Sequence, residues 1–313
     1  MSGTPLRLGT RRSPMAMAQS AQVAQLVTAR TGREVELVGL ATLGDVSKAH
    51  LTQIGGTGVF VSALRLSLRS GEVDFAVHSL KDLPTSPDDD LLVAAITRRD
   101  DPRDALVARG GVKLADLPAG ARIGTGSPRR AAQLLLLRPD VRPVPIRGNA
   151  GTRLAKVDSG EVDAVVLAYA GLARIGRLDV VSQVFEIDEM LPAPGQGALA
   201  VECLTSRAPV AELLSRVDDS ASRATTTAER GLLAALQAGC TAPVGAYAAG
   251  TEALRLDAIV VAADGGAALR ASAAGPAAHA GRLGRQVAAD LLSRGAGIYT
   301  DVSAGHLSNG DDA

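Results

Sequence analysis

The sequence predicts two similar α/β lobes followed by a smaller α+β domain, and three observations carry this prediction. First, the chain has 313 residues, and 46% of them are hydrophobic. This length exceeds the roughly 250 to 300 residues that one hydrophobic core organises. Second, a strand, a Gly-Thr turn and a Ser-Pro helix start occur at residues 6–14 and again at 122–128. Third, Gly-Glu-Val-Asp precedes an apolar strand at residues 71–74 and again at 160–163. Repeated segments of this kind indicate two related lobes.

The first helix of each lobe has a clear start signal. Ser13 is a good N-cap and is followed by proline, so we expect a helix over residues 14–30 that ends at Gly32. In the second copy Ser127 is the cap of a helix expected over residues 129–138.

Each lobe also has a buried strand that leads directly into a polar loop. The apolar strands at residues 75–77 and 164–167 are followed by the loops HSLKDLP and AYAGLAR. In open α/β sheets, ligands gather at such carboxyl ends of strands. We therefore expect a cleft between the two lobes, faced by these loops and by both helix N-termini.

From about residue 218 the pattern changes to that of a smaller α+β domain. Asp-Gly-Gly at residues 264–266 is a hairpin turn signal, which favours an antiparallel three-stranded sheet. The expected elements are a helix at 221–237, strands at 244–249, 254–263 and 267–273, and a last helix at 279–293.

Composition excludes several classes of function. Lys plus Arg equals Asp plus Glu at 33 each, and aromatic residues make up 2%, so neither duplex binding nor base stacking is expected. Two cysteines and four scattered histidines argue against a disulfide framework or a metal site. No signal peptide and no apolar run of about 18 residues is evident. We expect a cytoplasmic protein without membrane partners. The sequence shows no large amphipathic surplus that would indicate an oligomer, so we expect a monomer.

Arginine is concentrated in the predicted cleft, beside Gly, Ser or Thr in four separate turns. Guanidinium groups bind carboxylates in bidentate geometry. An arginine in the first turn of a helix is locally unfavourable, which suggests that a bound anion offsets the cost. The alternative is that these arginines form solvated faces or surface ion pairs. The residues concerned are Arg11, Arg12, Arg129, Arg130, Arg147, Arg153 and Arg174.

Two further residues could carry chemistry. Asp82 follows a buried strand beside Lys81, where a carboxylate could stabilise a cationic intermediate and move protons; it could equally be a turn-forming residue. Cys240 follows a helix stop, so its thiol could be accessible and nucleophilic, or inert. Cys203 lies in an apolar strand and is interpreted as a small core residue.

At this point the sequence closely resembles one family, the hydroxymethylbilane synthases or porphobilinogen deaminases. The resemblance extends from about residue 6 to residue 292. It rests on the stretches GTRRSP, GGTGVFV, DFAVHSLKDLP, DDPRDA, GTGSPRR, RGNAGTRL, LPAPGQGALAVEC and AGCTAPVGAY, in order and at family-like spacing.

The resemblance implies a transferase of porphyrin and heme biosynthesis that joins four porphobilinogens, with loss of ammonia, into a linear tetrapyrrole. It implies a dipyrromethane cofactor on Cys240 through a thioether, held by Lys81, Ser127, Arg129, Arg130, Arg147 and Arg153. Asp82 is the candidate catalytic carboxylate. The implied substrate-binding residues are Arg11, Ser13, Phe60, Arg147, Arg153, Arg174 and Gln196.

The resemblance also implies lobes like those of periplasmic solute-binding proteins, with the chain crossing back into the first lobe. The expected boundaries are 1–97 with 197–217 for lobe 1, 98–196 for lobe 2 and 218–313 for the C-terminal domain. The sequence departs from many relatives at Leu43, Gln53 and Thr57, where basic residues are absent. GTGSPRR also replaces a more usual TSSLRR, which should stiffen the helix start.

The main alternative is a non-catalytic solute-binding protein, since two similar α/β lobes around a cleft describe those equally well. An export signal would be expected in such a protein, and a third domain presenting a cysteine would have no use there.

Overall fold

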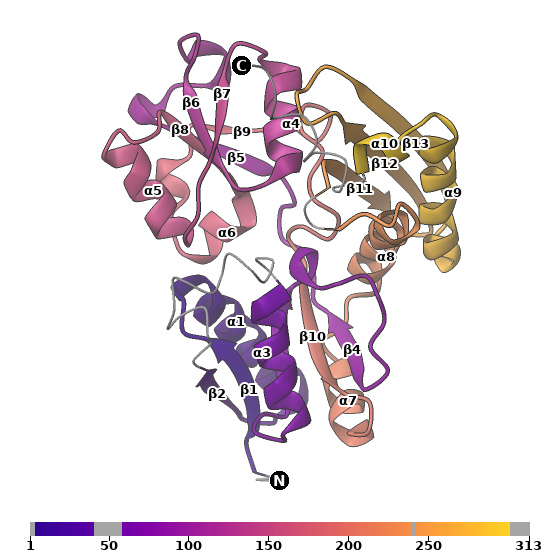
Figure 1. The fold of residues 1–313 in the computed structure, drawn as a ribbon. Helices are drawn as coiled ribbons and strands as arrows, with labels where there is room; N and C mark the ends of the chain where they lie inside the picture. The colour runs from indigo at the N-terminus through magenta and orange to yellow at the C-terminus, as the bar shows by residue number, and fades with distance from the viewer. Residues whose placement is uncertain (1–3, 41–57, 240–241, 301–313) are drawn as a thin grey trace, which may run out of the picture. The chain divides into compact units, whose positions relative to one another are not determined.

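The computed structural model describes residues 4–40, 58–239 and 242–300, apart from the side chains of residues 58–60 (Figure 1). They form two compact units. Unit 1 comprises Met1–Pro102, Ala173–Gly176 and Gly195–Arg223, and unit 2 comprises Arg103–Leu172, Arg177–Pro194 and Ala224–Ala313.

Unit 1 is built on a mixed five-stranded sheet of order β2-β1-β3-β10-β4. Its strands are β1 (Leu6–Arg11), β2 (Val35–Leu40), β3 (Phe75–Ser79), β4 (Leu91–Ile96) and β10 (Leu199–Leu204). β1 is parallel to both β2 and β3, whereas β10 is antiparallel to β3 and β4. Apolar side chains of α1 (Pro14–Thr31) and α7 (Ala208–Ser215) join one core cluster of the sheet, and those of α3 (Gly58–Arg69) join another.

Unit 2 contains a second mixed five-stranded sheet with the same arrangement, in the order β7-β6-β8-β5-β9. Its strands are β5 (Asp104–Ala108), β6 (Arg122–Thr125), β7 (Arg142–Pro145), β8 (Ala164–Ala168) and β9 (Gln183–Val184). Here β6 is parallel to β7 and β8, and β5 is antiparallel to β8. The helices that follow its strands are α4 (Pro128–Leu137), α5 (Ala150–Asp158) and α6 (Tyr169–Arg174), of which the last two residues of α6 belong to unit 1. Thus β5 occupies in this sheet the place that β10 occupies in the first.

The repeated Gly-Glu-Val-Asp motif has the same structural role in both sheets. The Asp74 carboxylate accepts the backbone N–H of Arg7 at 2.9 Å, and the Asp74 N–H donates to the Arg7 carbonyl at 2.8 Å. Asp163 does the same with Arg122, at 2.7 and 2.9 Å. Each aspartate therefore joins the start of one strand to its parallel neighbour.

Both predicted Ser-Pro helix starts are confirmed. The Ser13 hydroxyl accepts the N–H of Ala16 at 3.3 Å, and the Ser127 hydroxyl accepts the N–H of Arg130 at 3.5 Å. Gly32 ends α1 in the left-handed conformation at φ 70°, as expected for a helix-terminating glycine.

The C-terminal part of unit 2 is the predicted α+β structure. α8 (Ser220–Ala235) is followed by an antiparallel sheet in the order β11-β12-β13, with β11 (Val244–Gly250), β12 (Ala253–Val261) and β13 (Ala268–Pro276), and then by α9 (Ala280–Ser293) and α10 (Gly297–Thr300). β13 runs three residues past the predicted end at 273 because it stays paired with β12 as far as Pro276. Short 3₁₀ helices occupy Leu80–Asp82, Arg109–Gly111, Leu114–Asp116, Leu178–Val180 and Ala277–His279.

Within unit 2 the antiparallel sheet packs against α4 of the mixed sheet. Gly265 in the β12–β13 turn lies so close to α4 that an added Cβ would be 2.5 Å from the Cβ of Leu135. The Ala246 N–H of β11 donates to the Pro192 carbonyl at 2.9 Å. The two sheets of unit 2 are therefore joined by packing as well as by the chain.

The strand orders confirm the predicted fold class of two mixed α/β sheets and an antiparallel three-stranded sheet. Across the described ranges, no helix combines the length and the apolar character needed to cross a membrane.

Candidate active site

Asp82 lies at the carboxyl end of β3, in the 3₁₀ helix Leu80–Asp82. Leu80 is buried and fixes this turn, because its N–H donates to the Ala198 carbonyl at 3.0 Å. Asp82 itself is half-buried, and no donor among the described residues binds its carboxylate. The carboxylate is therefore held at the sheet edge by its backbone and remains available to a ligand.

Lys81 is oriented by Gln196 in unit 1. The Lys81 ammonium donates to Gln196 Oε1 at 3.1 Å, and Gln196 Nε2 donates to the Pro102 carbonyl at 2.7 Å. Arg99 Nε donates to the backbone carbonyl of Gln196 at 2.8 Å. The side chain predicted to bind substrate, Gln196, is thus almost fully buried and holds Lys81.

The remaining predicted residues at this sheet are Arg11, Ser13 and Phe60. Arg11 is the last residue of β1, which is parallel to β3, so Arg11 and Asp82 lie at the same edge of the sheet. Ser13 uses its hydroxyl as a helix cap. Phe60 is in the first turn of α3, and its side chain lies outside the described part of the structure.

Arg174 at the end of α6 has internal partners. It forms an ion pair with Asp100 at 2.8 Å, and its Nη2 donates to the Gly197 carbonyl at 2.6 Å. Burial lowers the pKa of Arg174, although Asp100 opposes this effect. Arg174 therefore joins two chain segments, near Asp100 and near Gly197, that are distant in sequence.

Arg129 and Arg130 lie in the first turn of α4, and both bind Asp104, the first residue of β5. Asp104 is completely buried; it lies 2.7 Å from Arg129 Nη1, and its Oδ1 accepts from Arg130 Nη2 at 2.7 Å. Burial alone would raise the pKa of Asp104, but the two guanidiniums hold it far below its usual range.

The sequence analysis does not identify Asp104, and this residue corrects the expectation of a bound anion at the start of α4. The cost of arginines in the first turn of α4 was attributed to a bound anion, whereas Asp104 supplies an internal one. The only available signal was an acidic residue in DDPRDA, and nothing local connects it to residues 25 and 26 positions later.

Arg147 and Arg153 differ from these two, because neither contacts a carboxylate within the described residues. Arg153 Nε donates to the Gly148 carbonyl at 2.9 Å, and Asn149 caps α5 through the Thr152 N–H. Burial, together with the positive charge of Arg130, lowers the pKa of Arg153. Arg153 is thus a half-buried cation whose charge is disfavoured by a like charge, and an anionic ligand would relieve this cost.

Of the two cysteines, Cys203 lies within the described residues. Cys203 on β10 is fully buried, and burial raises its pKa to about 11, which confirms it as a core residue. Cys240 lies outside the described residues, as do Leu43, Gln53 and Thr57. The described residues on either side of Cys240, Gly239 and Ala242, belong to unit 2.

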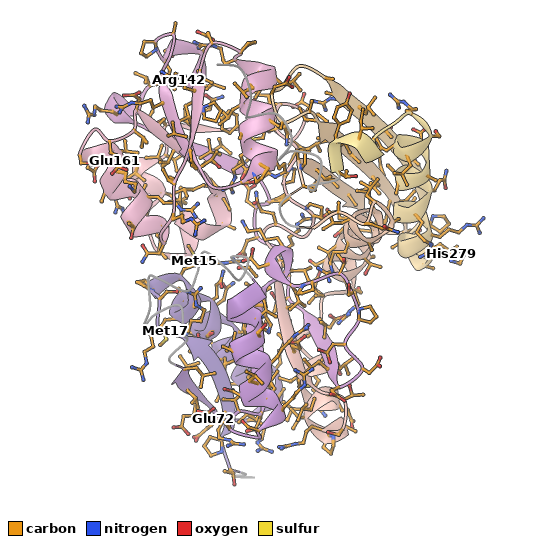
Figure 2. All side chains as sticks on the ribbon, viewed as in Figure 1. Met15, Met17, Glu72, Arg142, Glu161 and His279 are labelled. Carbon is orange, nitrogen blue, oxygen red and sulfur yellow. The ribbon has the colours of Figure 1, made fainter. Side chains whose placement is uncertain are left out.

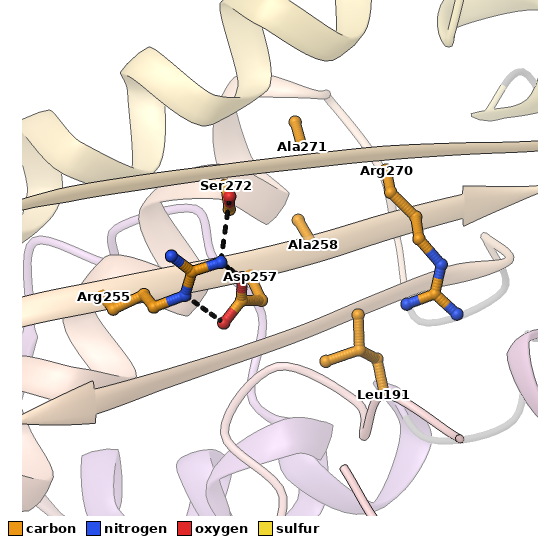
Figure 3. Close-up of a pocket in the computed structure, with 7 residues that line it drawn as sticks. All are labelled: Leu191, Arg255, Asp257, Ala258, Arg270, Ala271 and Ser272. Atoms are coloured by element: carbon orange, nitrogen blue, oxygen red, sulfur yellow. Dashed lines mark hydrogen bonds and ion pairs between the residues drawn. The ribbon is translucent and has the colours of Figure 1, made fainter. Parts of the chain in front are cut away.

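A shallow cavity of about 260 Å³ lies on the antiparallel sheet of unit 2 (Figure 3). Arg255 binds Asp257 at 2.8 Å and Ser272 at 3.2 Å on one side of it, and Leu191 and Arg270 line the other. None of the predicted site residues lines this cavity. In the part of the chain that the structure describes, no group of three or more His, Cys, Asp or Glu side chains could hold a metal.

In this α/β protein, Asp82 of unit 1 and Arg147 and Arg153 of unit 2 are charged residues for which the described residues supply no oppositely charged partner. Two family models match the chain: "Porphobilinogen deaminase, dipyromethane cofactor binding domain" over residues 6–212 and "Porphobilinogen deaminase, C-terminal domain" over residues 224–293. The chain belongs to the porphobilinogen deaminase family.

Relatives with this name match along almost the whole chain. Porphobilinogen deaminase of Thermobifida fusca is 61% identical and covers 97% of this chain and 99% of its own length. Porphobilinogen deaminase 1 of Streptomyces coelicolor is 54% identical, with 95% and 97% covered. Among solved structures, a periplasmic substrate-binding protein of an ABC transporter from Coxiella burnetii matches with a TM-score of 0.43 and 16% identity, covering 68% of this chain and 91% of its own.

Proposed function

We propose that this chain joins four porphobilinogen molecules head to tail on a dipyrromethane attached to Cys240, and then releases the tetrapyrrole hydroxymethylbilane by hydrolysis. One observation supports this most directly: Arg147 and Arg153 are cations without a carboxylate partner among the described residues, in a region matched by a cofactor-binding family model. Each porphobilinogen carries an acetate and a propionate, so the ligand is a polyanion that guanidiniums can hold.

The proposed cofactor-holding residues are Cys240, Lys81, Ser127, Arg129, Arg130, Arg147 and Arg153. When bound, the dipyrromethane supplies the terminal pyrrole to which the first substrate ring is joined. Arg147 and Arg153 would bind its carboxylates directly. Arg129 is almost fully buried and paired with Asp104, so its contribution is to fix the start of α4.

Asp82 is the proposed catalytic residue. Its carboxylate would stabilise the positive charge that remains on the substrate ring when the C–N bond breaks and ammonia leaves. It would then accept the proton that the attacking pyrrole carbon releases as the new C–C bond forms. Lys81, the residue before Asp82, is held in place by the hydrogen bond that its ammonium donates to Gln196.

The proposed substrate-binding residues are Arg11, Ser13, Phe60, Arg147, Arg153, Arg174 and Gln196. Arg174 and Gln196 have internal hydrogen bonds to Gly197 and Pro102, so their support for substrate binding would come from holding these segments in place. We also propose that the protein is a cytoplasmic monomer, which light scattering on the purified protein and cell fractionation would test.

Covalent attachment is tested by intact-protein mass spectrometry of the wild-type protein, Cys240→Ser and the control Cys203→Ser, all produced in a porphyrin-making host. Attachment forms a bond between Sγ and the substrate methylene and breaks its C–N bond, with the thiol proton leaving as part of ammonia. We expect an adduct in the wild type and in Cys203→Ser, and the bare polypeptide mass in Cys240→Ser. A wild-type mass equal to the bare polypeptide would reject the proposal.

A further inference from the structure

Asp104 is at the centre of a buried charge cluster in unit 2. Its Oδ2 lies 2.7 Å from Arg129 Nη1, and its Oδ1 accepts from Arg130 Nε at 3.0 Å and from Nη2 at 2.7 Å. Asp104 has 0% exposure, whereas Arg129 and Arg130 have 3% and 5%. One carboxylate therefore orients two guanidiniums that are adjacent in the sequence.

Beyond Asp104, Arg129 contacts the segment that leads to β10. Arg129 Nη1 also donates to the Leu191 carbonyl at 2.8 Å. Gln133 donates to the same carbonyl at 3.0 Å and accepts the Leu191 N–H at 2.9 Å. The next residue, Pro192, accepts the N–H of Ala246 in β11. Arg129 thus stabilises the Leu191–Pro192 segment, through which β11 contacts the rest of unit 2.

Arg130 has different partners beyond Asp104. Its Nη1 donates to the Val166 carbonyl in the middle of β8 at 3.1 Å. Its positive charge also reaches Arg153 and lowers the pKa of that residue. Arg130 therefore belongs to the buried cluster and is also close enough to Arg153 to affect its charge.

We propose that Asp104 is a positioning residue for attachment and binding of the cofactor: it presets the Arg130 guanidinium before any ligand arrives. This inference rests on the proposed function. With two arginines and one carboxylate, the cluster has a net charge of two minus one, or +1, and Arg153 adds a further positive charge near Arg130. Asp104 lowers the attraction for an anion by one charge, so its benefit must come from geometry.

A charge effect and a positioning effect of Asp104 predict opposite changes in the rate of attachment. Asp104→Asn removes a negative charge while keeping the shape of the side chain, so a pure charge effect would make porphobilinogen bind and react faster. If Asp104 acts by positioning, the same change slows the reaction, because the oriented hydrogen bonds to Arg130 Nε and Nη2 lose their charged acceptor.

The experiment starts from apoprotein made in a host that cannot synthesise porphobilinogen. Wild type, Asp104→Asn and Glu202→Gln are incubated with porphobilinogen, and the fraction carrying an adduct is followed by intact-protein mass spectrometry. Glu202→Gln is the matched control, because it removes a buried, arginine-paired carboxylate from the sheet of unit 1. We expect attachment to be slower by about tenfold or more in Asp104→Asn, and unchanged in Glu202→Gln.

A measurement on the wild-type apoprotein covers the case in which Asp104→Asn does not fold. The Nε–H of Arg130, assigned through Arg130→Lys in spectra of arginine-labelled protein, should exchange with water more slowly than that of the exposed Arg147. Rapid exchange of the Arg130 Nε–H, or attachment in Asp104→Asn at the wild-type rate or faster, would overturn the inference. A wild-type apoprotein that gains no adduct would instead reject the proposed function.

Discussion

Replacing Glu202 by glutamine should destabilise unit 1 by about 3 kcal/mol at neutral pH. Glu202 on β10 is 1% exposed, its carboxylate accepts from Arg65 Nη2 at 2.8 Å and from Nε at 3.2 Å, and His78 Nε2 lies 3.2 Å away. Two unit charges about 4 Å apart at an effective dielectric constant of about 20 interact by about 4 kcal/mol. Breaking a buried pair costs about 3–5 kcal/mol. Asp88, 3.4 Å from Arg65 Nη1, remains as a second partner and keeps the loss at the lower end.

The contribution of Glu202 to the free energy of unfolding depends on pH, and its direction follows from the pKa of this residue. Burial alone would raise the pKa of Glu202, but the nearby His78 imidazole and the hydrogen-bonded Arg65 guanidinium hold it below the usual value of 4.5. A carboxyl with a lowered folded-state pKa stabilises the protein above its unfolded pKa, and the contribution is lost as pH falls through the folded value. The difference between wild type and Glu202→Gln should therefore be constant above pH of about 5 and narrow below it.

The assay is urea unfolding at pH 7 and at several lower values, with hydrogen exchange followed in peptides of α3, which carries Arg65. The control is Glu212→Gln on the exposed face of α7, expected within about 0.5 kcal/mol of wild type. A loss below about 1 kcal/mol for Glu202→Gln at pH 7, or a difference that does not narrow in acid, would show that this carboxylate is not held as described.

Two further predictions concern Asp82, the proposed catalytic residue, and the packing of the C-terminal helices. Asp82→Ala should nearly abolish turnover of porphobilinogen while intact mass still shows the adduct, because the carboxylate acts on the reacting groups; normal turnover would remove Asp82 from the mechanism. Gly284→Ala should cost about 1–3 kcal/mol in thermal or urea unfolding, since the new Cβ would be 2.2 Å from the Ala228 carbonyl oxygen and would force α8 and α9 apart. Gly281→Ala in the same helix is the control: its nearest neighbour is a side-chain atom of Arg285 at 3.5 Å, and equal losses in both variants would contradict the packing argument.

Features that depend on neighbouring residues could be predicted from the sequence. The caps at Ser13 and Ser127 and the stop at Gly32 follow from backbone groups within a few positions, and the structure contains all three. Cys203 was predicted as a core residue from its apolar neighbours, and it is fully buried.

Contacts between residues that are far apart in the sequence could not be predicted in this way, because they depend on the order of the strands in each sheet. Asp104 meets Arg129 and Arg130 because β5 is inserted next to β8 in a sheet whose other strands come later in the chain. Lys81 meets Gln196 across 115 positions because β10 returns to pair with β3. Hydrophobic periodicity specifies that a strand is buried, but it does not say which strand becomes its neighbour.

The same contrast separates the duplicated scaffold from the site. Asp74 and Asp163 make equivalent backbone contacts in the two sheets, so these repeated residues serve strand pairing. The segments after the equivalent strands β3 and β8 differ: one carries the open carboxylate of Asp82, and the other ends in Arg174, which is paired with Asp100. Loops outside a sheet can change without disturbing its hydrogen bonds. The two sheets can therefore share one architecture while the residue proposed to be catalytic occurs only in the segment after β3, and the arginine in the segment after β8 forms an internal ion pair.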